Sequence, residues 1–121
     1  MKKIGHRGAA GYSPENTLIS FQKAIDLKVD GIELDVHLSA DNQVMVIHDE
    51  TINRTTNGNG KVTNLKSSEL RKLKIPILEE VIELVDKKCW INIEIKDEKA
   101  TPFVLSIIEN SIVKQNWNYN L

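Results

Sequence analysis

Two segments of this chain alternate between apolar and polar residues, and this period of two predicts strands. In residues 31–37 the apolar face consists of Ile32, Leu34 and Val36, and the polar face consists of Glu33, Asp35 and His37. In residues 90–96 the apolar face consists of Ile91, Ile93 and Ile95, and the polar face consists of Asn92, Glu94 and Lys96. Shorter apolar runs at residues 3–5 and 44–47 indicate two further strands.

Apolar residues at helical spacing predict three helices among and after these strands. The first is opened by residues 14–16 with Asn16 as its N-cap, and its apolar stripe consists of Leu18, Phe21 and Ile25. The second follows Pro76, and its apolar face consists of Leu78, Val81, Ile82 and Val85. The third begins with Thr101 as N-cap and Pro102 in the first turn, and it carries Val104, Ile107 and Ile108. Strands and helices mostly alternate, which predicts a parallel α/β arrangement in one domain, residues 1–121.

Residues 49–75 have no strong period, apart from a short helix predicted at residues 67–73. Loops of this length are uncommon in a compact domain and are usually functional or disordered. We therefore interpret this segment as a loop or insertion region. The tail, residues 115–121, also lacks a period and is expected to have no regular structure.

Composition excludes several classes of partner. The 121 residues include 16 basic and 17 acidic ones, a net charge of -1, so no basic face for nucleic acid is expected. No apolar run approaches the ~18 residues of a membrane span, and no signal peptide follows Met1, which predicts a cytoplasmic protein. The single cysteine, Cys89, has no disulfide partner or zinc-site spacing, so we expect a buried thiol.

Three carboxylates lie on the polar faces of the two alternating strands. Glu33 and Asp35 share one face of their strand, and Glu94 occupies the equivalent face of the later strand. Neighbouring carboxylates repel each other, and a divalent cation removes that repulsion. An all-oxygen set suits Mg²⁺ or Ca²⁺. The alternative is a half-exposed edge strand with solvated charges, which is the commoner interpretation of an isolated Glu-x-Asp.

Two histidines follow predicted strands, where α/β proteins place their sites. The unperturbed imidazole of histidine has a pKa of ~6.5, which suits one ring to act as a base and another as an acid near neutral pH; His6 and His48 are the candidates. Asp49 adjoins His48, but neighbouring strand residues face opposite ways, so we do not expect it to orient the ring. The alternative for either histidine is a hydrogen-bonded structural residue.

Two cations complete the candidate set. Arg7 can bind phosphate oxygens with its forked guanidinium, and Lys96 can supply a point charge beside Glu94. Either is equally consistent with a surface cation. Phosphate-loop, dinucleotide-binding and Gly-x-Ser-x-Gly motifs are absent from the sequence, so nucleotide cofactors and a serine nucleophile are not indicated.

Several separate motifs, in order, resemble the glycerophosphodiester phosphodiesterase family over about residues 4–97. They are His6-Arg7-Gly8, Pro14-Glu15-Asn16-Thr17, Glu33-Leu34-Asp35-Val36, His48-Asp49, Arg54-Thr55-Thr56-Asn57-Gly58 and Ile93-Glu94-Ile95-Lys96. Their agreement in order is far more specific than any one of them alone. The segment Ile75 to Glu80 also looks like the family's approach to a helix.

The resemblance implies a TIM-barrel hydrolase that cleaves glycerophosphodiesters, small-molecule substrates, to an alcohol and glycerol 3-phosphate. It implies that Glu33, Asp35 and Glu94 hold a divalent ion, Mg²⁺ or Ca²⁺. By the same resemblance, His6 and His48 act as general acid and base, and Arg7 contacts phosphate.

A full (β/α) barrel takes about 250 residues, so this chain is expected to form a partial TIM barrel, about the first half. Its inner face would then be open, with Val44 and Val46 exposed to water, and a homodimer through the open barrel edge is expected. A different class of function stays open beside the hydrolase: a catalytically silent fragment or binding module that retains the site residues.

Overall fold

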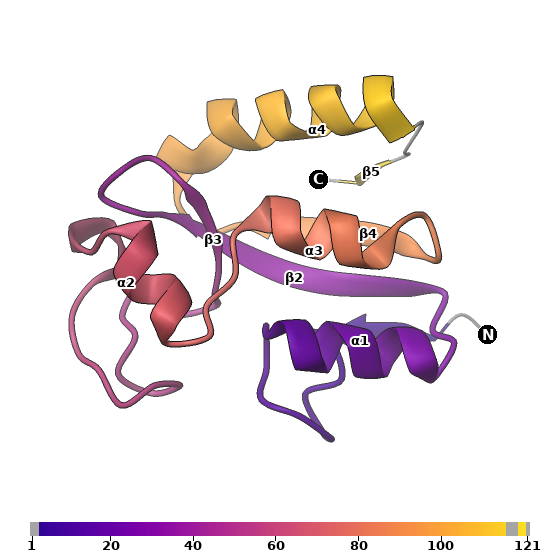
Figure 1. Cartoon of the computed structure of the whole chain (residues 1–121), viewed down its shortest axis with the longest axis horizontal. Coiled ribbons are helices and arrows are strands. Elements are labelled where there is room, and N and C mark those ends of the chain that lie inside the picture. Colours follow the sequence, from indigo (N-terminus) through magenta and orange to yellow (C-terminus); the bar gives the residue numbers. More distant parts are fainter. Residues whose placement is uncertain (1–2, 116–118, 121) are drawn as a thin grey trace.

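The computed structural model of the protein describes residues 3–115 and 119–120 (Figure 1). Within these residues, five strands and four helices follow each other, with two short 3₁₀ turns at Val62–Asn64 and Glu98–Ala100. The strands are β1 (Ile4–His6), β2 (Gly31–Leu38), β3 (Val44–Val46), β4 (Trp90–Ile95) and β5 (Tyr119–Asn120). The helices are α1 (Leu18–Asp26), α2 (Ser67–Lys72), α3 (Leu78–Val85) and α4 (Thr101–Gln115).

The central sheet is parallel, in the order β1-β2-β4-β5. In its register Glu33 stands beside His6 on β1, and Asp35 stands beside Glu94 on β4. Parallel strands joined by α1 and α3 form part of a (β/α) barrel, so the predicted fold class is confirmed.

β3 differs from a parallel arrangement. It pairs with the end of β2 in the antiparallel sense, with Val46 opposite Val36 and Val44 opposite Leu38. The connection, residues 39–43, is a tight turn in which the Ser39 amide donates to the Gln43 carbonyl at 2.9 Å. Such a turn is too short for the crossover that a parallel pair requires, so only a hairpin can form.

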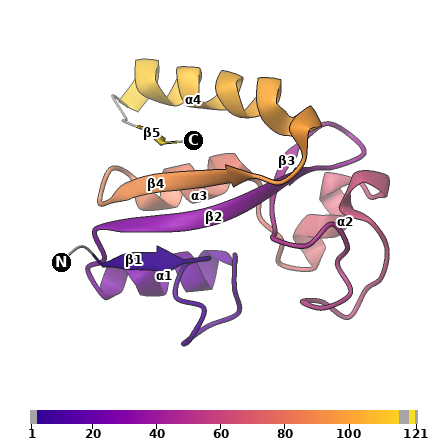
Figure 2. The same cartoon turned by 180° about the vertical axis from the view of Figure 1, so that it is seen from behind.

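Helices cover one face of the sheet and leave the other face open. Figure 1 shows α1 and α3 in front of the strands, and Figure 2 shows β1, β2 and β4 from behind with no helix of the described chain over them. The main hydrophobic core fills the space between sheet and helices. Its largest fully buried members are Phe21, Ile32, Leu34, Leu78, Ile91 and Ile93. α4 adds Val104 and Ile108 to this core.

The expected exposure of Val44 and Val46 is wrong. Each is only 1% exposed, and both belong to the main core. The hairpin register places them opposite Leu38 and Val36, on the face that the helices cover. The open inner face is therefore more polar than the sequence led us to expect.

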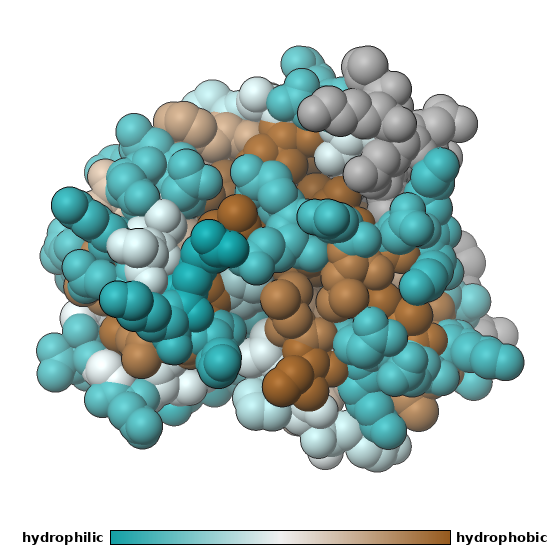
Figure 3. Space-filling model, in the orientation of Figure 1, coloured by the Kyte–Doolittle hydropathy of each residue, from teal (hydrophilic) through white to brown (hydrophobic). Residues whose placement is uncertain are grey.

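Residues 49–75 form an ordered insertion around a small core of their own. Ile52, Val62, Leu70 and Ile75 are buried there together with Met45 and Ile47 of the β3 segment. The short helix predicted in this segment is confirmed as α2. On the helix-covered side of the molecule, apolar surface remains visible over α1 and α3, where Ile19 of α1 is exposed (Figure 3).

Two helix starts differ from prediction. The N-cap of α1 is Thr17, whose hydroxyl accepts from the Ser20 amide at 3.2 Å, because the side chain of Asn16 is engaged elsewhere. Thr101 is already helical, and Asp97 caps the 3₁₀ turn before it.

In the tail, Tyr119–Asn120 pair with β4 as β5, contrary to expectation, and residues 116–118 and 121 lie outside the described chain.

Cys89 is half-buried against the main core and not fully buried. Its burial raises the pKa of the thiol, because the charged thiolate would lose hydration.

Candidate active site

Three carboxylates meet on the open face of the sheet. One oxygen each from Glu33, Asp35 and Glu94 lies within 4.8 Å of the others. The predicted placement of these residues on one face is therefore confirmed. They differ in exposure, since the side chain of Asp35 is 1% exposed, that of Glu33 12% and that of Glu94 54%.

The environment of Glu33 disfavours its charged form. Burial, followed by the neighbouring charge of Asp35, raises the pKa of Glu33 to about 7. Both carboxylate oxygens of Glu33 are buried without a hydrogen-bond partner among the described residues. A carboxylate whose oxygens are buried without a hydrogen bond, beside two other carboxylates, fits a hard divalent cation such as Mg²⁺ or Ca²⁺, whose charge would stabilise it.

Of the two predicted histidines, His6 contacts this cluster and the ring of His48 contacts Asp49. His6 ends β1, and its Nε2 lies 3.3 Å from Oε2 of Glu33. His48 follows β3, and its Nδ1 lies 2.7 Å from Oδ1 of Asp49. The expectation that Asp49 does not reach the ring is therefore wrong. β3 ends at Val46, so strand alternation no longer separates the two side chains.

Arg7 and Lys96 both reach carboxylates at this site. The Nε of Arg7 lies 3.5 Å from Asp35, and its Nη1 lies 3.3 Å from Glu15. The Nζ of Lys96 lies 2.7 Å from Glu94. This pairing lowers the pKa of Glu94 and raises the pKa of Lys96. Each cation therefore adjoins a carboxylate of the cluster.

The turn that carries Arg7 is fixed by close packing against α1. The Arg7 amide donates to the Glu33 carbonyl at 2.8 Å, and the Ser20 hydroxyl donates to the Arg7 carbonyl at 3.2 Å. Gly8 has a φ of +81°, and a Cβ there would lie 2.5 Å from Oγ of Ser20. Only glycine fits this position without strain, so the glycine of the His6-Arg7-Gly8 motif follows from the backbone.

Sequence reasoning missed four residues that contact the site. Asn16 donates its amide to Asp35 at 3.1 Å, and His37 contacts the His48 carbonyl through Nε2 at 2.8 Å. Glu15 and Arg54 form a paired contact near His48. The only signal for Glu15, Asn16 and Arg54 was their place in the family-like motifs. His37 was assigned to the polar face, but nothing in the pattern gave it a partner.

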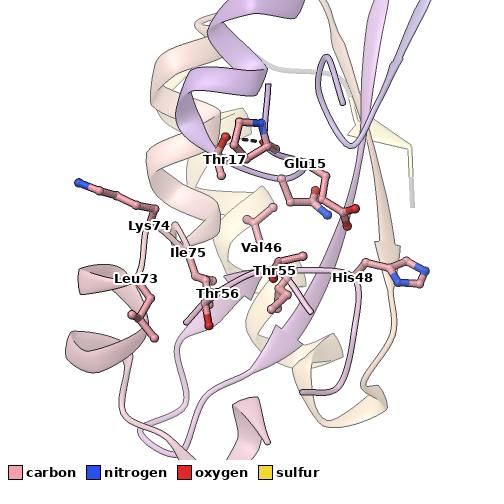
Figure 4. A pocket seen from close by; sticks show the side chains of 12 residues that line it. Glu15, Thr17, Val46, His48, Thr55, Thr56, Leu73, Lys74 and Ile75 are labelled. Atoms are coloured by element: carbon pink, nitrogen blue, oxygen red, sulfur yellow. Dashed lines mark hydrogen bonds between the residues drawn. The ribbon is translucent and has the colours of Figure 1, made fainter. Parts of the chain in front are cut away.

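A cavity of about 230 Å³ lies between the loop before α1 and the insertion. Val46, Thr56, Leu73 and Ile75 line it, and Figure 4 shows the ring of His48 pointing away from them. Glu15, Asn16 and His48 also line this cavity, so it adjoins the candidate site on the side away from the His48 ring.

Comparison with known proteins identifies the chain. The sequence model of the Glycerophosphoryl diester phosphodiesterase family matches residues 6–120. A glycerophosphodiester phosphodiesterase of Caldanaerobacter subterraneus is 42% identical over 97% of this chain and 53% of its own length. One from Bacillus altitudinis is 44% identical over 79% of this chain and 45% of its own length.

Solved structures of similar proteins support the same family. A crystal structure of a glycerophosphodiester phosphodiesterase from Thermotoga maritima superposes with a TM-score of 0.86 at 42% identity, covering 91% of this chain and 50% of that one. An Oleispira antarctica phosphodiesterase, solved in complex with the product sn-glycerol-3-phosphate, gives 0.78 at 31% identity, covering 100% and 55%.

Acidic side chains on the parallel strands β2 and β4, with His6 at the carboxyl end of β1, are consistent with the site of a barrel enzyme. Within that class, this chain belongs to the glycerophosphoryl diester phosphodiesterase family. It spans about half the length of the relatives it matches. No helix within the described residues is long and apolar enough to cross a membrane.

Proposed function

We propose that this chain carries the metal-binding and proton-transfer part of a hydrolase that converts glycerophosphodiesters to an alcohol and glycerol 3-phosphate. The observation that carries the proposal is the carboxylate cluster, whose three oxygens lie within 4.8 Å of one another beside His6. The relatives' names support the substrate class.

In this proposal Glu33, Asp35 and Glu94 hold Mg²⁺ or Ca²⁺. The bound ion would neutralise charge on the phosphoryl oxygens. Arg7 would donate two N–H groups to the phosphate, and Lys96 would add a positive charge beside it. A cytoplasmic location, as the sequence indicates, stays a prediction.

The two histidines divide the proton transfers. In a glycerophosphodiester the free 2-hydroxyl adjoins the phosphate and is the attacking group we propose. One histidine takes its proton as the new O–P bond forms, and the other protonates the leaving alkoxide as the O–P bond to the alcohol breaks. Water then opens the cyclic phosphate, with the two rings exchanging roles, and glycerol 3-phosphate leaves.

The test is release of glycerol 3-phosphate by the purified chain, with and without EDTA. We expect EDTA-sensitive release that falls at least about 100-fold in His6→Ala and in His48→Ala, because each removes a proton carrier. The control, Glu109→Ala, changes an exposed residue of α4 and should leave the rate unchanged. Full activity in both histidine variants would contradict the assignment.

The open inner face favours a second candidate. A chain that keeps the site residues on an uncovered sheet could be a silent binding module that meets a partner through its open edge. The mass in solution, measured in the same experiment, separates the two. A dimer with EDTA-sensitive release supports the enzyme, and a monomer or aggregate without release supports the silent module.

A further inference from the structure

Arg54, in the insertion, joins two loops of the site by using both sides of its guanidinium. On one side Nε and Nη2 donate to the two oxygens of Asp49 at 2.8 and 3.1 Å. On the other side Nη1 and Nη2 donate to the two oxygens of Glu15 at 2.9 Å each. Such forked pairs fix the orientation of both carboxylates, which a single point charge does not.

Asp49 is thereby held between Arg54 and His48. Its Oδ1 lies 2.7 Å from Nδ1 of His48 and accepts from Arg54 as well. An ionised carboxylate only accepts hydrogen bonds, so Nδ1 of the neutral ring must carry the proton. The pKa of Asp49 lies well below its ordinary range, first because of Arg54 and then because of His48, which keeps the carboxylate ionised.

The same contacts continue to the carboxylate cluster. Glu15 also accepts a hydrogen bond from Nη1 of Arg7 at 3.3 Å, and Nε of Arg7 lies 3.5 Å from Asp35. Charges of alternating sign thus run from Asp35 through Arg7, Glu15 and Arg54 to Asp49. His48 lies at the end of this series, with Nδ1 of its ring in contact with Asp49.

We propose that Arg54 is a positioning residue: by clamping Asp49, it holds His48 in the Nδ1–H tautomer, with Nε2 free to exchange protons with substrate. The catalytic use of this arrangement rests on the proposed function. The contacts of Arg54, Asp49 and His48 themselves are present in the protein without substrate. Arg54 touches no reacting atom and acts through Asp49.

The experiment is ¹⁵N–¹H correlation of the imidazole rings in the full chain, without metal or substrate, at a pH where the rings are neutral. The chain has 3 histidines, so the spectrum is simple. We expect His48 as Nδ1–H in the wild type. In Arg54→Gln its tautomer ratio should shift by at least about tenfold toward Nε2–H, the worth of one charge-assisted hydrogen bond.

Two controls accompany the variant. Arg71→Gln makes the same substitution elsewhere in the insertion, at an arginine with one ion pair, 3.2 Å to Glu80, and should leave His48 unchanged. His37 serves within each spectrum, because its Nε2 must donate to the His48 carbonyl and its ring should stay Nε2–H. An unchanged His48 tautomer in folded Arg54→Gln overturns the proposal.

Arg54→Lys keeps the charge and loses the fork, so it should shift the His48 tautomer in the same direction. If Arg54→Gln does not fold, as circular dichroism would reveal, an unchanged tautomer in Arg54→Lys overturns the proposal instead. The proposed function fails separately. Absence of glycerol 3-phosphate release with the predicted tautomers would refute the hydrolase and retain the positioning role, and release with an unaffected tautomer would do the reverse.

Discussion

Glu33 combines burial with proximity to another carboxylate, and each makes its ionisation unfavourable. A carboxylate in such an environment is common at sites that bind an ion or transfer a proton. At a purely structural position, a neutral side chain would be more stable. Without a bound ion, the charged form of Glu33 therefore destabilises the folded protein.

The consequence for stability has a definite sign. The pKa of Glu33 is raised from 4.5 to about 7, so the folded chain binds more protons than the unfolded chain within that window. In EDTA, the free energy of unfolding should therefore fall as pH rises from 4.5 to 7, by on the order of 2 kcal/mol. Urea unfolding at a series of pH values measures it.

Glu33→Gln should remove this loss of stability, because the amide does not titrate. Glu83→Gln, at an exposed position of α3, should retain it. Equal pH dependence in the Glu33→Gln variant and the wild type would show that Glu33 titrates normally.

Among the elements, α1 does more than cover the sheet, because its start supports the loop that carries Asn16. Thr17 caps α1 and also donates its hydroxyl to the Pro14 carbonyl at 2.7 Å. The neighbouring Asn16 adopts a φ of 53° and contacts Asp35. Capping and site support are thus divided between adjacent residues.

Thr17→Ala should lower the free energy of unfolding by about 1 kcal/mol, because the Ser20 amide loses its partner. Thr17→Ser keeps the hydroxyl and should behave as the wild type. Urea unfolding of the three proteins decides the matter. A Thr17→Ala variant as stable as Thr17→Ser would mean that the cap contributes nothing.

Periodicity predicted the elements better than their partners. The alternation in residues 31–37 and 90–96 was sufficient to place Glu33, Asp35 and Glu94 on one face, because side-chain direction in a strand is a local property. The antiparallel direction of β3 follows from the short turn at residues 39–43, which the alternation of apolar and polar residues does not reveal. The Arg54–Glu15 pair joins residues 39 positions apart, and no local pattern encodes such a contact.

At the scale of the whole molecule, the chain presents one covered and one open face of its sheet. The open face has charged groups together with Ile4, which is 53% exposed. Among the strands that the structure describes, β1 pairs with β2 alone and so lies at an edge of the sheet. Exposed strand edges favour pairing with another chain.

We expect the 121-residue chain to self-associate, as a dimer through its open edges. Because Val44 and Val46 are buried, we expect the contact to form at the edge of β1 and not through these two side chains. Sedimentation equilibrium should show a mass that rises with concentration toward twice the monomer. A single monomer mass at all concentrations, with a sharp melting transition that does not depend on concentration, would refute this.

The central claim is that Glu33, Asp35 and Glu94 form a divalent-cation site. Calorimetric titration with Mg²⁺ and Ca²⁺ at pH about 8, where Glu33 is ionised, tests it most directly. We expect the wild type and Glu83→Gln to bind one ion, and Glu33→Gln to bind none. Ion binding that is unchanged in Glu33→Gln would contradict the account and leave the three carboxylates as solvated charges on an open sheet.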